Sequence, residues 1–132
     1  MVGIYPACFY PDDDGVTVIF HDLPGCTTFG KDIEEAFLMA DEAGCGWIYG
    51  EIVRGEPVPP PSNLADVKAD DFEDGFVSLI RLDIDAYAEK YHSKSVRKNC
   101  TVPAWLATLA ERKGFNFSIL LQDAIKQNLD LA

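Results

Sequence analysis

The sequence predicts an α+β fold in two domains, residues 1–92 and 93–132. Short apolar runs separated by Asp, Gly and Pro turns fill the first part of the chain, as in an antiparallel β-meander. A helical apolar pattern follows them and would pack on the sheet. The C-terminal stretch holds one strand pattern and two helical patterns. Its net charge is positive, whereas that of the preceding part is negative. The N-terminal domain is therefore expected to be a β-meander with a packed helix.

Two strands joined by a tight turn are expected at the N-terminus. Ile4–Tyr10 and Val16–Phe20 are rich in strand-forming residues, and the Asp-Gly pair at 14–15 between them is typical of a hairpin. A second turn at 21–25 leads to a short third strand, Cys26–Phe29.

An amphipathic helix is expected after the third strand. Asp32 can cap its N-terminus, and Glu34 and Glu35 suit the positive end of the helix dipole. The apolar stripe is formed by Ile33, Ala36, Phe37 and Ala40. The helix can continue through Ile48, with strain where two glycines interrupt its second half.

The chain then becomes irregular before a last strand and helix. Residues 54–63 contain four prolines, three of them consecutive, and so predict a stiff extended connection. Residues 65–75 are polar and acidic. Phe76–Leu82 alternates as the last strand of the sheet, Ile84–Tyr91 fits a short helix, and His92–Ser95 is the best linker to the second domain.

The C-terminal domain opens with a strand pattern from Val96 to Val102. Because strand side chains alternate between two faces, one face carries Val96, Cys100 and Val102. The other, polar face carries Arg97, Asn99 and Thr101. The strand should end at Pro103, which lacks a backbone donor but suits the first turn of a helix.

Two helical patterns follow this strand. The first runs to Gly114, a natural helix C-cap, and the second begins after Asn116, which can act as its N-cap. One strand and two helices of this length cannot bury their own apolar faces, and a lone strand is open to pairing. We therefore expect a homodimer in which two strands pair antiparallel and four helices cover one face of the ribbon.

Such a ribbon would present a polar face that suits DNA. Arg97, Asn99 and Thr101 of both chains would enter the major groove, where Arg reads guanine and Asn reads adenine. The strand, Pro103, the Gly114 turn and the start of the second helix together resemble a ribbon-helix-helix DNA-binding domain.

That resemblance implies further DNA contacts. In the family, backbone amides at the start of the second helix bind a phosphate, which here assigns the role to Asn116, Phe117 and Ser118. Lys94 and Lys98 would lie near phosphates, although Lys98 has the parity of the inner face and must extend its head outward. A helix-turn-helix, or a dimerisation arm that never contacts DNA, is the alternative interpretation.

The charge of the chain is divided unevenly. Residues 1–92 contain 5 Lys and Arg against 19 Asp and Glu, a net charge of −14, whereas residues 93–132 contain 6 against 3, a net charge of +3. The C-terminal part suits a polyanion and the N-terminal part suits a cationic partner. A solvated acidic surface with no partner would also explain the N-terminal charge.

Several classes of protein are disfavoured by the sequence. No run approaches transmembrane length and the N-terminus lacks the pattern of a secretory signal, so a cytoplasmic protein is expected. The four cysteines have no CxxC spacing, which favours reduced thiols over a metal site or disulfides. We expect no cofactor.

One run of the N-terminal domain has a distinctive pattern. The turn Asp-Leu-Pro-Gly-Cys at 22–26 is followed by Glu-Glu-Ala at 34–36. Three consecutive prolines at 59–61 and the segment Leu82–Tyr87 follow further along the chain. With the C-terminal segment, these features resemble the HicB-type antitoxin family over nearly the whole chain. The resemblance implies a partial ribonuclease H-like fold for residues 1–92.

A nuclease is nevertheless not expected, and no catalytic residue is assigned. Two-metal hydrolysis needs carboxylates that converge on the ions. The first expected strand contains no acid, and the consecutive residues Asp12–Asp14 point in different directions. Glu34 and Glu35 are adjacent and cannot share a helix face. His21 has no evident nucleophile beside it.

The resemblance instead implies a binding role. The partner would be a small basic HicA-type toxin that cleaves messenger RNA, and the chain would occlude its active site and repress its own operon. Candidates for toxin contacts are Asp12, Asp13, Asp14, Asp22, Glu34 and Glu35. A soluble hairpin tip is the competing interpretation of the Asp run. A stand-alone regulator, a purely structural module and a homotetramer built from the dimer remain open.

Overall fold

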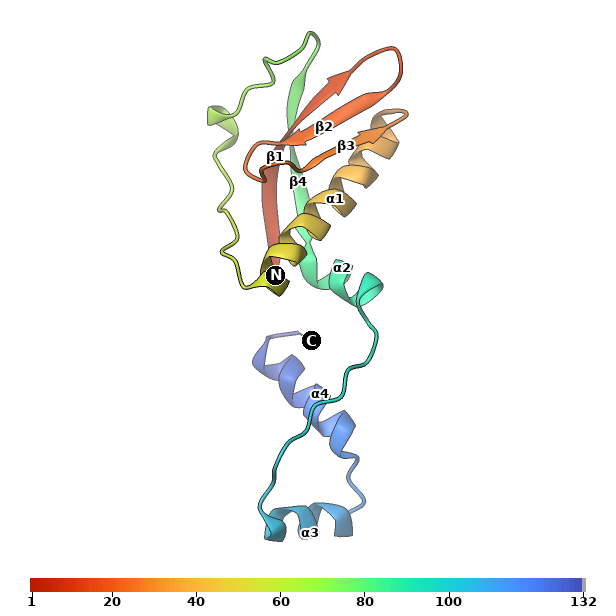
Figure 1. Cartoon of the computed structure of the whole chain (residues 1–132), viewed down its shortest axis with the longest axis vertical. Helices are drawn as coiled ribbons and strands as arrows, with labels where there is room; N and C mark the ends of the chain where they lie inside the picture. The colour runs from red at the N-terminus through yellow and green to blue at the C-terminus, as the bar shows by residue number, and fades with distance from the viewer. Residues whose placement is uncertain (132) are drawn as a thin grey trace. The chain divides into compact units, whose positions relative to one another are not determined.

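The computed structural model describes residues 1–131 and divides them into two compact units. The first unit is Met1–Lys94, and the second begins at Ser95. The division falls inside the stretch His92–Ser95 that the sequence suggests as a linker. Figure 1 labels the elements of both units.

The first unit is built on a four-stranded antiparallel sheet, which confirms the predicted α+β class and the meander (Figure 1). Its strand order is β3-β2-β1-β4. The strands are β1 (Val2–Pro11), β2 (Val16–Phe20), β3 (Thr27–Gly30) and β4 (Phe76–Asp83). The last strand pairs along β1, from Val2 opposite Asp83 to Phe9 opposite Phe76.

The turn between β1 and β2 is stabilised by the side chain of its first residue, Asp12. The Asp12 carboxylate accepts hydrogen bonds from the backbone N–H groups of Asp14, at 2.7 Å, and Gly15, at 3.1 Å. Gly15 has a φ of 151°, and a Cβ atom there would lie 2.4 Å from the carbonyl oxygen of Gly30. The hairpin therefore needs glycine at this position.

Helix α1 (Ile33–Arg54) packs across one face of the sheet (Figure 1). The predicted cap is confirmed, because the Asp32 carboxylate accepts a hydrogen bond of 2.8 Å from the N–H of Glu35. The helix runs further than the sequence suggests and ends at Gly55, which adopts a left-handed conformation with a φ of 73°. The expected connection from residue 54 therefore begins one residue later.

Beyond α1, the connection and the last helix complete the first unit. The acidic stretch contains an unpredicted 3₁₀ turn, η1 (Leu64–Asp66), and buries Val67 against Cys8 and Tyr10 on the other face of the sheet. Helix α2 (Ile84–Tyr91) has the predicted bounds and follows β4 directly. Its N-terminus is capped by the Asp83 carboxylate, which accepts from the N–H of Ala86 at 3.1 Å.

The second unit contains helices α3 (Ala104–Arg112) and α4 (Phe117–Asn128). Gly114 is left-handed with a φ of 71°, and the Asn116 side chain accepts from the N–H of Ile119 at 3.2 Å, as the sequence predicts. The segment Val96–Val102 differs from the prediction, because it forms no strand in the single chain. Its expected ladder partner is a second copy, and one chain cannot supply it.

Candidate functional site

The predicted base-reading residues lie in an extended segment before α3. Arg97, Asn99 and Thr101 are all exposed. Next to them, Lys98, Cys100 and Val102 line a hollow of 710 Å³ whose other walls are α3 and the start of α4. Asn99 also borders this hollow. Lys98, whose position in the expected strand puts it on the inner face, thus lies on the side of the segment that faces the helices.

The start of α4 lies on the same hollow. Phe117 and Ser118 line it together with Leu120 and Leu121. The first N–H groups of any helix lack partners within the helix, and they carry a partial positive charge that attracts anions. Lys98 and Asn99 therefore line the same hollow as Phe117 and Ser118, within one unit.

The second unit leaves its large apolar side chains in solvent. None of its residues described from Ser95 to Leu131 is buried. The exposed apolar residues include Val96, Trp105, Leu109, Ile119, Leu121 and Ile125. Exposed apolar surface on this scale marks an interaction site.

Part of the predicted acidic surface gathers at one end of the sheet. Val16 pairs with Gly30, so the hairpin tip Asp12–Asp14 lies beside the start of α1. Glu34 is exposed there, and Glu35 forms an ion pair of 3.8 Å with Lys31. An exposed pair of this kind contributes little to stability.

Asp22 lies at the opposite end of β2 and has a role that the sequence did not reveal. Its half-buried carboxylate accepts hydrogen bonds from the backbone N–H of Ser62, at 2.8 Å, and from the Ser62 hydroxyl. These bonds tie the proline-rich connection to the turn after β2. Both oxygens of Asp22 are engaged within the first unit.

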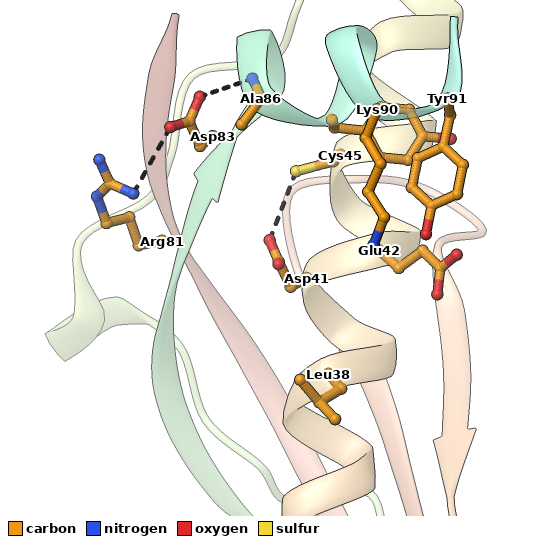
Figure 2. Close-up of a pocket in the computed structure, with 10 residues that line it drawn as sticks. Leu38, Asp41, Glu42, Cys45, Arg81, Asp83, Ala86, Lys90 and Tyr91 are labelled. Atoms are coloured by element: carbon orange, nitrogen blue, oxygen red, sulfur yellow. Dashed lines mark hydrogen bonds and ion pairs between the residues drawn. The ribbon is translucent and has the colours of Figure 1, made fainter.

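A groove that the sequence analysis missed lies between α1, β4 and α2 (Figure 2). It has a volume of 430 Å³. Helix α1 supplies Leu38, Asp41 and Glu42, and α2 supplies Tyr87, Lys90 and Tyr91. These residues are about fifty positions apart, so only the packing of α2 beside α1 brings them together.

The Cys45 thiol lines this groove without being reactive. It donates to the Asp41 carboxylate at 3.6 Å. Burial raises the pKa of the Cys45 thiol to about 12, and the negative charge of Asp41 adds to this shift. The thiol therefore stays protonated at neutral pH and serves packing. Within the part of the chain that the structure describes, no three His, Cys, Asp or Glu side chains gather to hold a metal ion.

Comparison with known proteins places these features in a family. A family model described as "HicB_like antitoxin of bacterial toxin-antitoxin system" matches residues 5–121. A protein of Haemophilus phage HP1 (strain HP1c1) is 30% identical over 104 residues, covering 78% of this chain and 75% of that protein. It is described as an uncharacterized 14.9 kDa protein in the rep-hol intergenic region.

Solved structures show the same similarity. A chain of a toxin–antitoxin complex from Streptococcus pneumoniae is 29% identical, with a TM-score of 0.61 over 97% of this chain and 99% of that chain. A chain of a HicA3 and HicB3 toxin–antitoxin complex is 26% identical, with a TM-score of 0.53 over 61% of this chain and 98% of that chain. Among the helices of residues 1–131, none is both long and apolar enough to cross a membrane.

Proposed function

Because this chain belongs to the family of HicB-like antitoxins of bacterial toxin–antitoxin systems, we propose that it binds a small basic HicA-type ribonuclease toxin and blocks its active site. We further propose that it represses its own operon by binding DNA in the major groove. Residues 1–92 would neutralise the toxin, and residues 93–132 would dimerise and bind the operator. The observation that carries this division is the contrast between an acidic unit with its own core and a basic unit that buries none of its described residues.

The first unit suits the toxin because of its charge. Its net charge of −14 over residues 1–92 would attract a basic protein and speed the encounter. The exposed acids at the hairpin tip and the start of α1, namely Asp12, Asp13, Asp14 and Glu34, would contribute to this field. The half-buried Glu35 would add to it, with Asp22 nearer the connection. The meander, helix and last strand would act as a partial ribonuclease H-like scaffold that binds without catalysis.

The second unit suits a ribbon-helix-helix dimer. Pairing two copies of Val96–Val102 would complete the missing ladder and bury the apolar residues that one chain exposes. Arg97, Asn99 and Thr101 would then face the major groove. Lys94, Lys98 and the α4 amides of Asn116, Phe117 and Ser118 would contact phosphates.

Replacing Asn99 with Ala tests the DNA contact. A bidentate Asn–adenine pair contributes about 1–3 kcal/mol, so Asn99→Ala should weaken operator binding by roughly 5- to 150-fold. Toxin binding should be unchanged, because Asn99 belongs to the other unit. A gel-shift titration measures the first quantity and surface plasmon resonance the second. Undiminished operator affinity would remove Asn99 from the DNA contact.

Expression from the native locus at low salt tests the function as a whole. Mass spectrometry of the purified chain should find a stoichiometric small basic protein that cleaves RNA once it is freed. Absence of such a partner, with the chain still dimeric and still binding DNA, would favour a stand-alone transcriptional regulator with an acidic sensing domain.

A further inference from the structure

Helix α1 exposes apolar side chains where it borders the groove. Leu38 is 67% exposed and Phe37 is 36% exposed, next to the side of the helix that is buried in the core. Leu38 lies three positions before Asp41 and four before Glu42, so these three side chains share one side of the helix. Exposed apolar side chains that gather beside a groove are typical of an interaction surface.

The exposed apolar surface extends from α1 onto the sheet. Phe37 and Phe76 both stack on the buried ring of Phe9, with centroid distances of 4.6 Å and 5.2 Å, and both remain partly exposed. Phe76 begins β4, which forms one edge of the sheet. The surface therefore runs from the start of β4 across to α1 and reaches the groove at Leu38.

The groove beyond Leu38 has the chemistry of a cation site. Asp41 and Glu42 of α1 are exposed, and Tyr87 and Tyr91 of α2 line the same groove. Figure 2 shows Tyr91 on the α2 side of this groove. The chain's own Lys90 already lies there, with its ammonium 5.1 Å from the centre of the Tyr91 ring, and Figure 2 shows it directed toward Glu42. Carboxylates beside aromatic faces favour ammonium and guanidinium groups.

We propose that this surface, composed of Phe37, Leu38, Asp41, Glu42, Phe76 and the groove beside them, is where the basic toxin docks. An apolar side chain of the toxin packs on Phe37 and Leu38, and a Lys or Arg side chain enters the groove between Asp41, Glu42 and the tyrosines. The inference rests on the proposed antitoxin function and assigns it a surface. It also moves the centre of the interface away from the hairpin tip, whose acids would steer the approach.

A cationic partner fits this surface better than a second copy does. Two copies of the first unit would each bring a net charge of −14 over residues 1–92 to the contact. Like charges brought together at an interface oppose association. The groove itself presents more carboxylates than cations, because Asp41, Glu42 and Asp83 face only Arg81 and Lys90. An apolar centre with an acidic rim matches a basic partner.

Two sets of variants in the full chain test the surface against the toxin that co-purifies from the native locus. Leu38→Ser should weaken toxin binding at least tenfold, mainly through faster dissociation. The double variant Asp41→Asn/Glu42→Gln should slow association severalfold and reduce its dependence on salt. Surface plasmon resonance at several salt concentrations measures both, and thermal melting verifies that each variant is folded.

Matched controls carry the same changes elsewhere. Val53→Ser removes a 68% exposed apolar side chain from the last turn of the same helix, and Glu89→Gln removes an exposed acid of α2 outside the groove. Both should bind the toxin within twofold of the unchanged chain. Toxin bound equally well by Leu38→Ser would overturn the surface and leave the antitoxin function standing. A loss of self-association in Leu38→Ser, with toxin binding intact, would assign the surface to a second copy. Absence of any toxin would overturn both proposals.

Discussion

The two units of this chain differ in what they bury. The first encloses a core of side chains from β1, β2, β4 and α1, including Phe9, Val18, Ile48 and Leu82. The second, over the residues that the structure describes, buries none, although its helices are regular and well capped. Correct local sequence signals are therefore sufficient for helices but not for a core. The first unit can therefore be stable as one chain, whereas we expect the second to need a second copy.

The dimer proposed for the second unit gives the largest expected effect. Leu121→Ser removes one apolar side chain from each copy, and burial of a Leu contributes about 1.5–3 kcal/mol, so the dimer should lose about 3–6 kcal/mol. Sedimentation equilibrium over a range of concentrations should show monomers where the unchanged chain is dimeric.

Cys100 supplies a second measurement of the same event. It is exposed in the single chain and has the parity of the inner face, so pairing of the ribbon should protect it from iodoacetamide. Labelling of Cys100 should be slow in the unchanged chain and fast in Leu121→Ser. Leu38→Ser, the same substitution in the first unit, is the control and should leave the mass and the labelling rate unchanged. A monomer at all concentrations in the unchanged chain would contradict the comparison.

The core of the first unit gives the next largest effect. Phe9 is fully buried, and Phe9→Ala should lower the free energy of unfolding of this unit by about 3–5 kcal/mol. Each unit contains one tryptophan, so a background in which Trp105 is replaced by Phe leaves Trp47 to report urea unfolding of the first unit alone.

The matched control for this change is Phe72→Ala, which removes an exposed ring from the same unit. It should change stability by about 0.5–1 kcal/mol or less, because only its edge contact with Tyr10 is lost. Dimerisation should persist in both variants, since the second unit does not share this core. Loss of dimerisation in the Phe9→Ala variant would show that the two units are not independent.

Local signals explain most of what the sequence predicted. The hairpin turn is closed by Asp12 and Gly15, and the caps Asp32 and Asn116 each bond to an N–H three residues away. These interactions involve neighbours in the chain, so they can be recognised from the order of residues. The bounds of β2 and α2 are correct for the same reason.

Contacts between distant residues explain what was missed. Asp22 accepts a hydrogen bond from Ser62, forty positions away in the chain. The groove is lined by residues of both α1 and α2. No local sequence pattern reveals either feature. The strand expected at Val96–Val102 needs a ladder partner that a single chain lacks. The length of α1 was underestimated because glycines lower helix propensity, whereas here packing outweighs propensity.

The smallest expected effects concern two of these glycines in α1, and they separate packing from propensity within one helix. A Cβ atom at Gly44 would lie 2.8 Å from the Cδ1 atom of Leu82 and 3.0 Å from the ring of Phe20. Both neighbours are buried and cannot move freely, so overpacking should cost about 1–3 kcal/mol. The gain of about 1 kcal/mol in helix propensity offsets this only in part. Gly44→Ala should therefore be destabilising in urea unfolding followed by Trp47.

Gly50→Ala is the matched change on the same helix. There a Cβ atom would meet only the flexible guanidinium of Arg54, at 3.4 Å, so the helix should gain up to about 1 kcal/mol. The two substitutions add the same methyl group to the same helix, and opposite signs would show that α1 needs glycine where it crosses β4 and not elsewhere. Equal stabilisation by both would mean that α1 can move away from the sheet at little cost. The core that distinguishes the first unit from the second would then be less tightly packed than its buried side chains indicate.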